Sequence, residues 1–363
     1  MLHAIFWLRV RNRTLLGTAS ARPTKANEYV CSCEARNLGL QSQPADVRHQ
    51  SLLKPSPPRR RRLKILVAGF LTIDTIQLPM RQITSVGGPP AYAGLICSRL
   101  GHEVLLLTRI GNDFPDEQVV WLARNGVVLR AADRSPNRPT TRFRISKTGD
   151  ERSLTLASRC EDLSSGQIPA DTRFNASLVS PLAGEVSTSL LTEISARSDF
   201  TFLDPQGFVR AFDREGRVTL APLRDRSVLS KIDAIKMDRA EAEMLTGKSD
   251  PRQALGKLAS IGLRKAIVTH GADVCHVLDG ARIYEVRVPS SPVVDTTGAG
   301  DILSGATMSW YLKTRDFLRS ACFGIAASSL SLHMIALAKV DLPMSVDESA
   351  LRLFAMAVPV ATV

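Results

Sequence analysis

Short apolar runs and helical segments alternate along the chain from Leu63 onward, and this alternation restricts the fold more than any other feature of the sequence. Pro89-Pro90 at the first helical turn and Gly101 directly after the last are typical helix ends. A repeated βαβ order predicts an α/β fold in which helices flank a central, mostly parallel sheet. The expected elements are strands at 64–69, 71–76, 104–109 and 127–131 with helices at 91–100 and 116–125, then strands near 178, 200–203, 234–236 and 266–269, and helices at 301–313, 316–332 and 347–357.

Residues 140–157 depart from this alternation of strands and helices. Polar and apolar residues alternate over 140–157 on both sides of a turn at 147–150. Such a pattern is typical of an antiparallel hairpin with one solvated face. We expect a small antiparallel β lid over a site, with lid elements near 70–86 and 138–158.

The first 62 residues carry most of the positive charge. They contain twelve Arg and Lys residues but only three acidic ones, which accounts for +9 of the chain's net +12. Three interpretations are open: a disordered basic tail, an Arg-rich organelle-targeting segment, or upstream sequence wrongly joined to the true start. We favour the last, because the change in composition lies directly against the first strand. We therefore place the folded domain at 63–357, whose small remaining charge gives no reason to expect nucleic acid.

Neither a membrane-spanning segment nor a zinc-binding site is expected from the sequence. No run reaches the roughly 18 to 20 apolar residues that a membrane span needs. Cys31 and Cys33 are spaced too closely for an ordinary zinc knuckle, and no second Cys or His cluster would complete a tetrahedral site. We expect reduced thiols in a cytoplasmic protein.

The segment Val294-Asp-Thr-Thr-Gly-Ala-Gly-Asp301 carries the clearest chemistry. The small residues Gly298, Ala299 and Gly300 let backbone N–H groups crowd together at a helix N-terminus, which stabilises an anion. Asp301 would repel a phosphate unless it had another task, and accepting the proton of a substrate hydroxyl is such a task. For a lone Gly-Ala-Gly, an N-cap Asp and a tight turn would be the simpler interpretation.

The motif Asp295-Thr-Thr-Gly-Ala-Gly-Asp301 resembles the C-terminal signature of the ribokinase (PfkB) family of carbohydrate and nucleoside kinases. The resemblance covers residues 63 to 357. It implies a Rossmann-like ribokinase fold with a small β lid, a catalytic base at Asp301, and the co-substrate ATP with Mg²⁺. Many relatives pair through the lid, so the resemblance allows a homodimer, but nothing in this sequence decides it.

Two further segments match the substrate side of the family pattern. Asp74 ends Gly69-Phe-Leu-Thr-Ile-Asp74, where the family Asp binds substrate hydroxyls, and Gly87-Gly88 matches the di-glycine that lets the substrate approach the backbone. Pro89 and Tyr92 stand where ribokinases proper have Lys and Asn. This difference argues against ribose as the substrate.

The resemblance also implies residues for the nucleotide and the metal. Lys236-Met-Asp238-Arg-Ala-Glu241 lies where the family has Asn-x-x-Glu, so Lys236 and Asp238 are assigned to the nucleotide and Glu241 to Mg²⁺ through water. From the residues alone, a solvated helix start is an equal alternative. Thr269 and Gly271 match the Thr-x-Gly that contacts nucleotide phosphates.

Asp295 and Thr297 correspond to residues that hold a monovalent cation in some relatives, so the resemblance allows K⁺ as a further ion.

The substrate is predicted from the hairpin and the segments after it. Four segments are similar to the myo-inositol kinase-like branch of the family: Thr141-Arg142-Phe143, Ser158-Arg-Cys-Glu161, Pro181-Leu-Ala-Gly-Glu185 and Asp204-Pro-Gln206-Gly-Phe-Val-Arg210. A polyol offers only hydroxyls, which Asp74, Gln206 and Arg142 would bind. Tyr92 or Phe143 would instead give a nucleoside a place for its base. We favour an inositol or another sugar over a nucleoside, and a catalytic protein over a non-catalytic binding protein on the same fold.

Overall fold

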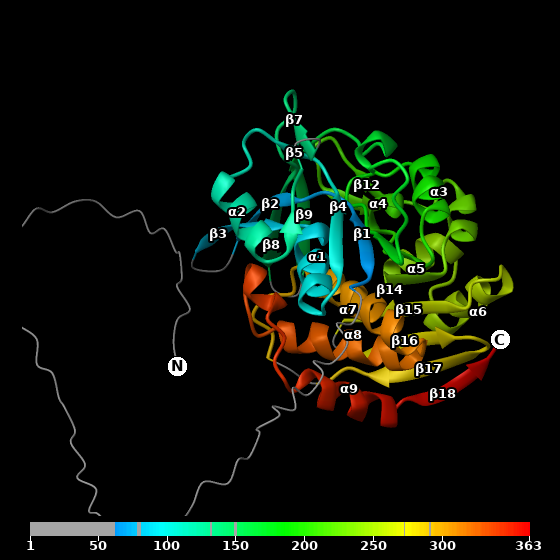
Figure 1. Ribbon diagram of the computed structural model, residues 1–363. Coiled ribbons are helices and arrows are strands. Elements are labelled where there is room, and N and C mark those ends of the chain that lie inside the picture. The colour runs from blue at the N-terminus through cyan, green and yellow to red at the C-terminus, as the bar shows by residue number, and fades with distance from the viewer. Residues whose placement is uncertain (1–61, 78–80, 131–132, 149–150, 272, 290–291) are drawn as a thin grey trace, which may run out of the picture. The chain divides into compact units, whose positions relative to one another are not determined.

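The computed structural model describes residues 62–77, 81–130, 133–148, 151–271, 273–289 and 292–363. The basic segment 1–61, and with it Cys31 and Cys33, lies outside the described residues. Within the described ranges, a ten-stranded sheet forms the centre of the domain (Figure 1). In spatial order its strands are β18 (Val358–Thr362), β17 (Arg282–Arg287), β16 (Val274–Asp279), β15 (Lys265–Thr269), β14 (Ala234–Asp238), β11 (Thr201–Leu203), β10 (Ala176–Val179), β1 (Lys64–Ala68), β4 (Glu103–Leu107) and β6 (Val127–Val128).

The sheet is parallel from β15 to β6 and antiparallel from β15 to β18. Helices cover both faces, and the two hydrophobic clusters of the core divide along the strands. Ile65 and Val67 of β1 pack in one cluster, whereas Leu66 and Ala68 pack in the other, as the alternation of side chains along a strand requires. The expected α/β class with a mostly parallel, helix-flanked sheet is therefore confirmed.

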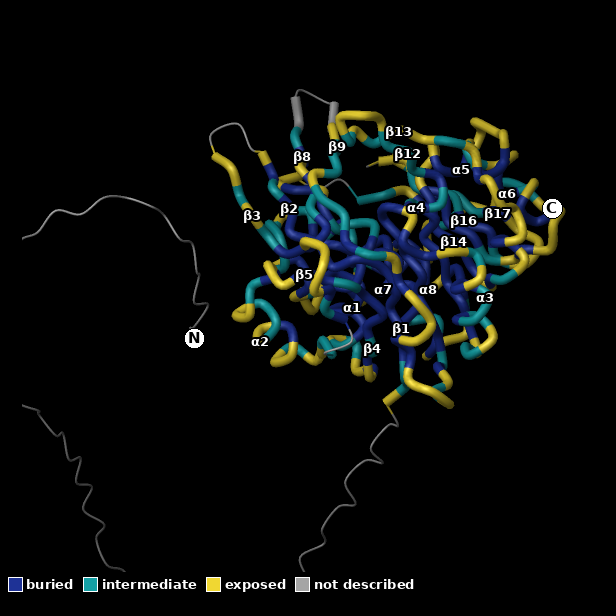
Figure 2. Tube along the Cα trace, turned by 90° about the horizontal axis from the view of Figure 1, so that it is seen from above, coloured by how far each residue is buried: buried dark blue, intermediate teal, exposed yellow. Residues whose placement is uncertain are grey.

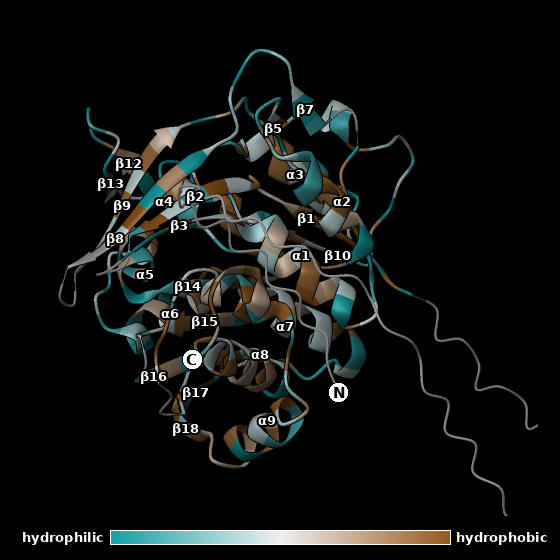
Figure 3. Ribbon diagram, turned by 90° about the vertical axis from the view of Figure 1, so that its left-hand side faces the viewer, coloured by the Kyte–Doolittle hydropathy of each residue, from teal (hydrophilic) through white to brown (hydrophobic). Residues whose placement is uncertain are grey.

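The cluster that contains Ile65 includes the helices α1 (Pro89–Arg99), α2 (Asp116–Arg124), α7 (Ala299–Thr314), α8 (Phe317–Ser331) and α9 (Val346–Ala355). The other includes α3 (Thr188–Ala196), α5 (Arg239–Thr246) and α6 (Pro251–Ser260). The central helix α7 is buried over most of its length (Figure 2). The outer helix α9 instead shows a hydrophobic and a hydrophilic face (Figure 3), because Val346, Ala350 and Leu353 are its buried residues.

A second sheet joins two segments that are far apart in the sequence. Its order is β3 (Gln82–Gly87), β2 (Thr72–Gln77), β8 (Arg142–Thr148) and β9 (Glu151–Ser158). We call it the cover sheet. The hairpin β8–β9 is antiparallel as expected, but β2 pairs with β8 in parallel, so this sheet is mixed. Its edge strand β3 alternates exposed and half-buried residues from Gln82 to Ser85 and ends in the buried Val86 and Gly87 (Figure 2).

Several short elements complete the described chain. They are β5 (Ile110–Gly111) with β7 (Arg134–Ser135), β12 (Arg210–Phe212) with β13 (Val218–Leu220), α4 (Gln206–Val209), and the 3₁₀ helices η2 (Ser165–Gln167), η3 (Arg226–Lys231) and η4 (Ala336–Val340).

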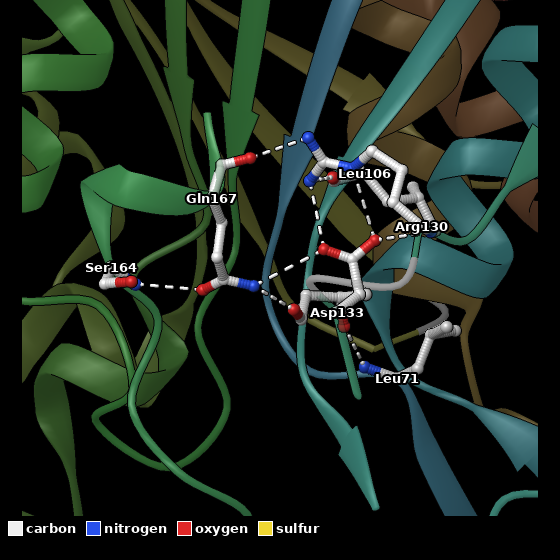
Figure 4. Close-up of polar contacts among 7 residues, drawn as sticks. Leu71, Leu106, Arg130, Asp133, Ser164 and Gln167 are labelled. Carbon is white, nitrogen blue, oxygen red and sulfur yellow. Dashed lines mark hydrogen bonds and ion pairs between the residues drawn. The ribbon is translucent and has the colours of Figure 1, made fainter. Parts of the chain in front are cut away.

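A buried polar cluster supports the entrance to the cover sheet (Figure 4). The Arg130 guanidinium forms an ion pair with Asp133 at 3.0 Å and donates to the carbonyl of Leu106 at 2.8 Å. The Gln167 amide donates to the carbonyl of Thr108 at 2.7 Å. The Thr108 hydroxyl accepts the Leu71 N–H at 2.8 Å, directly before β2. These bonds hold the loop from which β2 starts against the end of β4.

The C-terminal end of the chain differs from the expectation of a helical terminus. Val358–Thr362 forms the edge strand β18, which pairs with β17. A proline such as Pro359 is unusual within a strand, but an edge strand with a bulge tolerates one, and the register shifts between Ile283 and Tyr284 beside it. The strand expected at 127–131 ends at Val128, and Ala131 lies outside the described residues.

No helix in the described part of the chain is both long enough and apolar enough to cross a membrane.

Candidate active site

The side chains of the site follow the carboxyl ends of parallel strands. β1 lies between β10 and β4, so the chain leaves β1 toward one side of the sheet and later returns on the other. Ligands of open α/β sheets bind beside such a switch in strand order, at the carboxyl ends of the strands. Asp204 follows β11 and Asp238 ends β14, which places both at this edge.

A cavity of about 200 Å³ lies at this edge, beneath the cover sheet. Its wall combines residues of both sheets with the loop that enters α7. The residues that line it are Asp74, Gly88, Tyr92, Phe143, Ile145, Leu154, Leu182, Gln206, Arg210, Lys236, Asp238, Glu241, Thr296, Thr297, Gly298, Gly300 and Asp301. Most of the residues predicted from the sequence are thus brought together.

Asp301 lines the cavity from the first turn of α7. Its side chain is only 8% exposed, yet its Oδ1 accepts no hydrogen bond from any residue in the described part of the chain. Burial raises the pKa of Asp301 to about 7, and the Asp204 carboxylate contributes to the rise. A buried acceptor with a pKa near neutrality is suited to receive a proton from a bound hydroxyl.

The glycine loop before Asp301 passes close to the ring of Tyr92. Gly298 is the N-cap of α7 with φ of 76°, a left-handed conformation. A Cβ atom at Gly298 would lie 2.5 Å from the Tyr92 ring, so no larger residue fits. Ala299 does not line the cavity, and its N–H donates to the Thr296 carbonyl at 3.3 Å. Of the three predicted anion-binding residues, Gly298 and Gly300 therefore face the cavity.

A buried ion pair lies beside this loop. The Lys236 ammonium is 3.0 Å from Asp204 Oδ2. A Cβ atom at Gly300 would lie 2.8 Å from the same ammonium. Burial alone would lower the pKa of Lys236. The negative charges of Asp204 and Glu241 have the opposite and larger effect, so this pKa is raised. Lys236 was predicted from the sequence, whereas its partner Asp204 was not recognised as a site residue.

Asp238 and Glu241 form a reciprocal capping box at the start of α5. The Asp238 side chain accepts the Glu241 N–H at 2.7 Å, and the Glu241 carboxylate accepts the Asp238 N–H at 2.8 Å. Both residues also line the cavity, and Glu241 is buried instead of solvated. Burial raises the pKa of Glu241 to about 7 despite the opposing effect of Lys236.

Asp74 enters the cavity from β2 in the cover sheet, and Gly87 on the neighbouring strand makes room for it. The two strands pair so that Thr72 lies opposite Gly87. A Cβ atom at Gly87 would lie 2.2 Å from Asp74 Oδ2. Gly87 itself does not line the cavity, whereas Gly88 does.

Gln206 and Arg210 form the opposite polar wall. The Arg210 guanidinium donates to Gln206 Oε1 across one turn of α4. Arg210 was quoted in the sequence pattern but not assigned to the site. Of the apolar part of the wall, Phe143 was named as a place for a nucleoside base, whereas Ile145, Leu154 and Leu182 were not assigned. Alternating hydrophobicity in the hairpin was the available signal for Ile145 and Leu154.

Glu185 connects the loops that follow β1 and β10. Its carboxylate is buried and accepts the N–H groups of Phe70 at 3.0 Å, Leu182 at 2.9 Å and Ala183 at 2.7 Å. Burial raises the pKa of Glu185, and these N–H groups act against the rise. The carboxylate thereby positions Leu182 in the cavity wall.

Three predicted residues lie elsewhere. Arg142 forms an ion pair with Asp113 at 2.7 Å and does not line the cavity, contrary to its assignment as a substrate ligand. Thr269 at the end of β15 donates to the Met237 carbonyl at 3.4 Å, and Gly271 follows it with φ of 58°. Neither lines this cavity, and their assignment to the nucleotide stays a prediction.

Asp295 and Thr297 are the predicted ligands of a monovalent cation. The Lys339 ammonium lies at their oxygens, donating to the Asp295 carbonyl at 2.6 Å and the Thr297 carbonyl at 2.7 Å. It is also 3.1 Å from Asp295 Oδ2. Burial acts to raise the pKa of Asp295, but the Lys339 charge and the Thr297 N–H together lower it. Sequence reasoning missed Lys339, which is 42 residues beyond Thr297.

Comparison with known proteins agrees with this arrangement. The model of the pfkB family of carbohydrate kinases matches residues 67–337. The chain belongs to this family. The kinase is 26% identical over 261 residues to a cytidine kinase of Thermococcus kodakarensis, an alignment that covers 70% of this chain and 90% of that relative.

A second relative of the kinase is an inositol 3-kinase of Oryza sativa subsp. japonica. It is 28% identical over 289 residues, which cover 73% of this chain and 68% of the relative. A solved pyrophosphate-dependent kinase in the ribokinase family, complexed with a pyrophosphate analog and myo-inositol, has a TM-score of 0.66 at 24% identity. The match covers 76% of this chain and 97% of that chain. The expected ribokinase fold is confirmed.

Proposed function

We propose that this kinase transfers the γ-phosphoryl group of ATP to a hydroxyl of a small polyol or sugar, with myo-inositol favoured, and that Asp301 is the base. The observation that carries the proposal is the buried Asp301 Oδ1, which accepts no hydrogen bond from the described residues and lines a cavity at a helix N-terminus. An acceptor atom of this kind has a use when a hydroxyl is bound against it.

The transfer would be an in-line displacement. The hydroxyl O–H bond breaks as its proton moves to Asp301, and the oxygen forms a new bond to the γ-phosphorus while the bond to ADP breaks. The backbone at Gly298 and Gly300, at the positive end of α7, would stabilise the negative charge on the transferring group. Asp301 would then release the proton to solvent.

The residues present fit Mg²⁺, which the family resemblance implies. Asp238 and Glu241 offer carboxylate oxygens in the cavity, and a divalent cation would favour the charged form of the buried Glu241. Within the described ranges, no three His, Cys, Asp or Glu side chains lie close enough to hold a metal by themselves. Phosphate and water would therefore complete the coordination. Bound there, Mg²⁺ would neutralise charge on the phosphates.

Hydroxyl recognition is the basis for favouring a polyol. Asp74 on one side of the cavity and Gln206 with Arg210 on the other supply acceptors and donors for several hydroxyls. The relation to an inositol 3-kinase supports the same choice.

A nucleoside is the second candidate. Phe143, Ile145 and Leu154 give the cover sheet an apolar surface toward the cavity, against which a base would pack. The relation to a cytidine kinase supports this alternative. Tyr92, however, is 1% exposed beneath the glycine loop, so it offers little area for stacking.

The experiment is a substrate panel with two donors. Wild-type kinase is incubated with Mg²⁺ and either ATP or pyrophosphate, together with inositols, pentoses, hexoses or nucleosides, and the phosphorylated product is detected directly. Asp301→Asn is the test variant and Asp347→Asn the matched control, because Asp347 is also in a first helical turn but is exposed.

We expect phosphorylated myo-inositol with ATP from the wild type and from Asp347→Asn, and little product from Asp301→Asn. Product only with cytidine or another nucleoside would favour the second candidate. Product only with pyrophosphate would overturn ATP as the donor. Equal product from the wild type and Asp301→Asn would contradict the assignment of the base.

A further inference from the structure

The Lys339 side chain is completely buried, and its ammonium is surrounded by oxygens of the loop before α7. It donates to the Asp295 carbonyl at 2.6 Å and the Thr297 carbonyl at 2.7 Å, and lies 3.1 Å from Asp295 Oδ2. An ammonium has three N–H donors, so it is able to donate to all three of these oxygens. Lys339 comes from η4, a separate element of the chain.

These contacts orient the backbone that enters the active site. In a trans peptide the C=O and the following N–H point in opposite directions. Because the Thr297 carbonyl points to Lys339, the N–H of Gly298 must point away from Lys339. Gly298 lines the cavity and is the N-cap of α7. The ammonium thus favours the peptide orientation that an anion-binding turn at Gly298 requires.

The same contacts leave no suitable place for a separate monovalent ion at Asp295 and Thr297. The two carbonyls and the carboxylate are already bound to a positive charge, and a second cation at these oxygens would be repelled at short range. The K⁺ ion that the resemblance allows at these residues does not fit this loop.

We propose that Lys339 is a built-in monovalent cation, whose ammonium takes the place of a free ion at Asp295 and Thr297 and positions the anion-binding turn, so that the kinase needs no added K⁺. Lys339 is a positioning residue, since it acts through the loop. The proposal rests on the chain being a kinase of this family and not on which hydroxyl compound it phosphorylates.

The first test compares salts on the wild type. Phosphoryl transfer is measured in KCl, NaCl and tetramethylammonium chloride at equal ionic strength, about 0.1 M, so that general screening is constant. We expect rates that differ by less than about twofold, because screening is the only salt effect left. Activation of the wild type by K⁺ of about tenfold or more would overturn the proposal. Mutations of residues that support a metal site change activity on this scale.

The second test creates room for an ion. Lys339→Ala removes the ammonium, and Lys339→Met removes the charge while keeping most of the side-chain volume. In tetramethylammonium chloride we expect both variants to lose about 10- to 100-fold in kcat. K⁺ or NH₄⁺ should restore much of the activity of Lys339→Ala but not of Lys339→Met. Lys248→Ala, which removes an exposed lysine, is the control and should match the wild type.

A third readout needs no substrate. The melting temperature of Lys339→Ala should rise with K⁺ concentration relative to tetramethylammonium, because an ion that binds only the folded state stabilises it. The wild type and Lys339→Met should show no such K⁺-specific rise. If Lys339→Ala folds only in K⁺, the refolding yield gives the same answer. The proposal would be overturned if Lys339→Ala were as active as the wild type and if K⁺ changed neither its activity nor its melting temperature. A wrong acceptor substrate would leave the melting results unchanged.

Discussion

Replacing Asp301 with Asn should stabilise the protein without substrate at alkaline pH while removing its activity. The Asp301 pKa is raised from 3.8 to about 7 by burial and by Asp204, so the folded state holds a proton that the unfolded chain releases. The stability that this proton gives is fully present below pH 4 and is lost as the pH rises toward 7. Asn carries no charge at any pH and therefore avoids that loss.

The size of the effect follows from the pKa. Where the folded and unfolded states differ by one bound proton, the free energy of unfolding changes by about 1.4 kcal/mol per pH unit. The free energy of unfolding of Asp301→Asn should therefore gain about 3 kcal/mol relative to the wild type between pH 5 and 8. For a domain of about 300 residues this is a difference of about 5 °C in melting temperature. Most of the growth should occur below pH 7, with a plateau above it.

The assay is urea unfolding of the wild type, Asp301→Asn and the exposed control Asp347→Asn at several pH values. Asp347→Asn should follow the wild type, since its carboxylate is in solvent. A stability difference for Asp301→Asn that does not change with pH would refute the inference that Asp301 is protonated in the folded protein below neutrality.

Three other substitutions test the geometry. Gly87→Ala should raise the KM for the acceptor about tenfold or more, because its Cβ would lie 2.2 Å from Asp74 Oδ2; an unchanged KM in initial-rate measurements would contradict the role of this close approach. Arg210→Gln should move the acid limb of kcat/KM to higher pH, because Arg210 lowers the pKa of Asp301; a pH-rate profile that stays in place would disagree. Arg142→Ala should change the acceptor KM by less than about threefold, since its partly exposed ion pair with Asp113 lies outside the cavity, and a large rise would return Arg142 to the substrate site.

The site residues that could be predicted from the sequence are those that lie close together in one short segment of the chain. The glycine loop and Asp301 are consecutive, and Asp238 with Glu241 combines a capping box with the cavity wall. Such motifs need no tertiary information, because a helix N-terminus is defined by its own residues. The same holds for the strand and helix order, which periodicity indicates directly.

Residues that act through distant partners could not be found in this way. Lys236 was predicted, but its partner Asp204 was not, because the two are 32 residues apart and only the parallel pairing of β11 with β14 brings them together. Lys339 lies in a short 3₁₀ helix without a motif, so its role depends on where the chain returns after α8. The ion pair of Arg142 with Asp113, 29 residues earlier, was not predicted for the same reason.

The pH dependence of kcat/KM for the wild type and Asp301→Asn, with one accepted substrate and saturating donor, tests the central claim most directly. The wild-type value should fall about tenfold per pH unit below pH 7, where Asp301 is protonated. Asp301→Asn should be slower by about 10² to 10⁴ above pH 7 and should lack this acid limb. A variant that keeps the same limb at a rate near the wild type would show that another group accepts the proton.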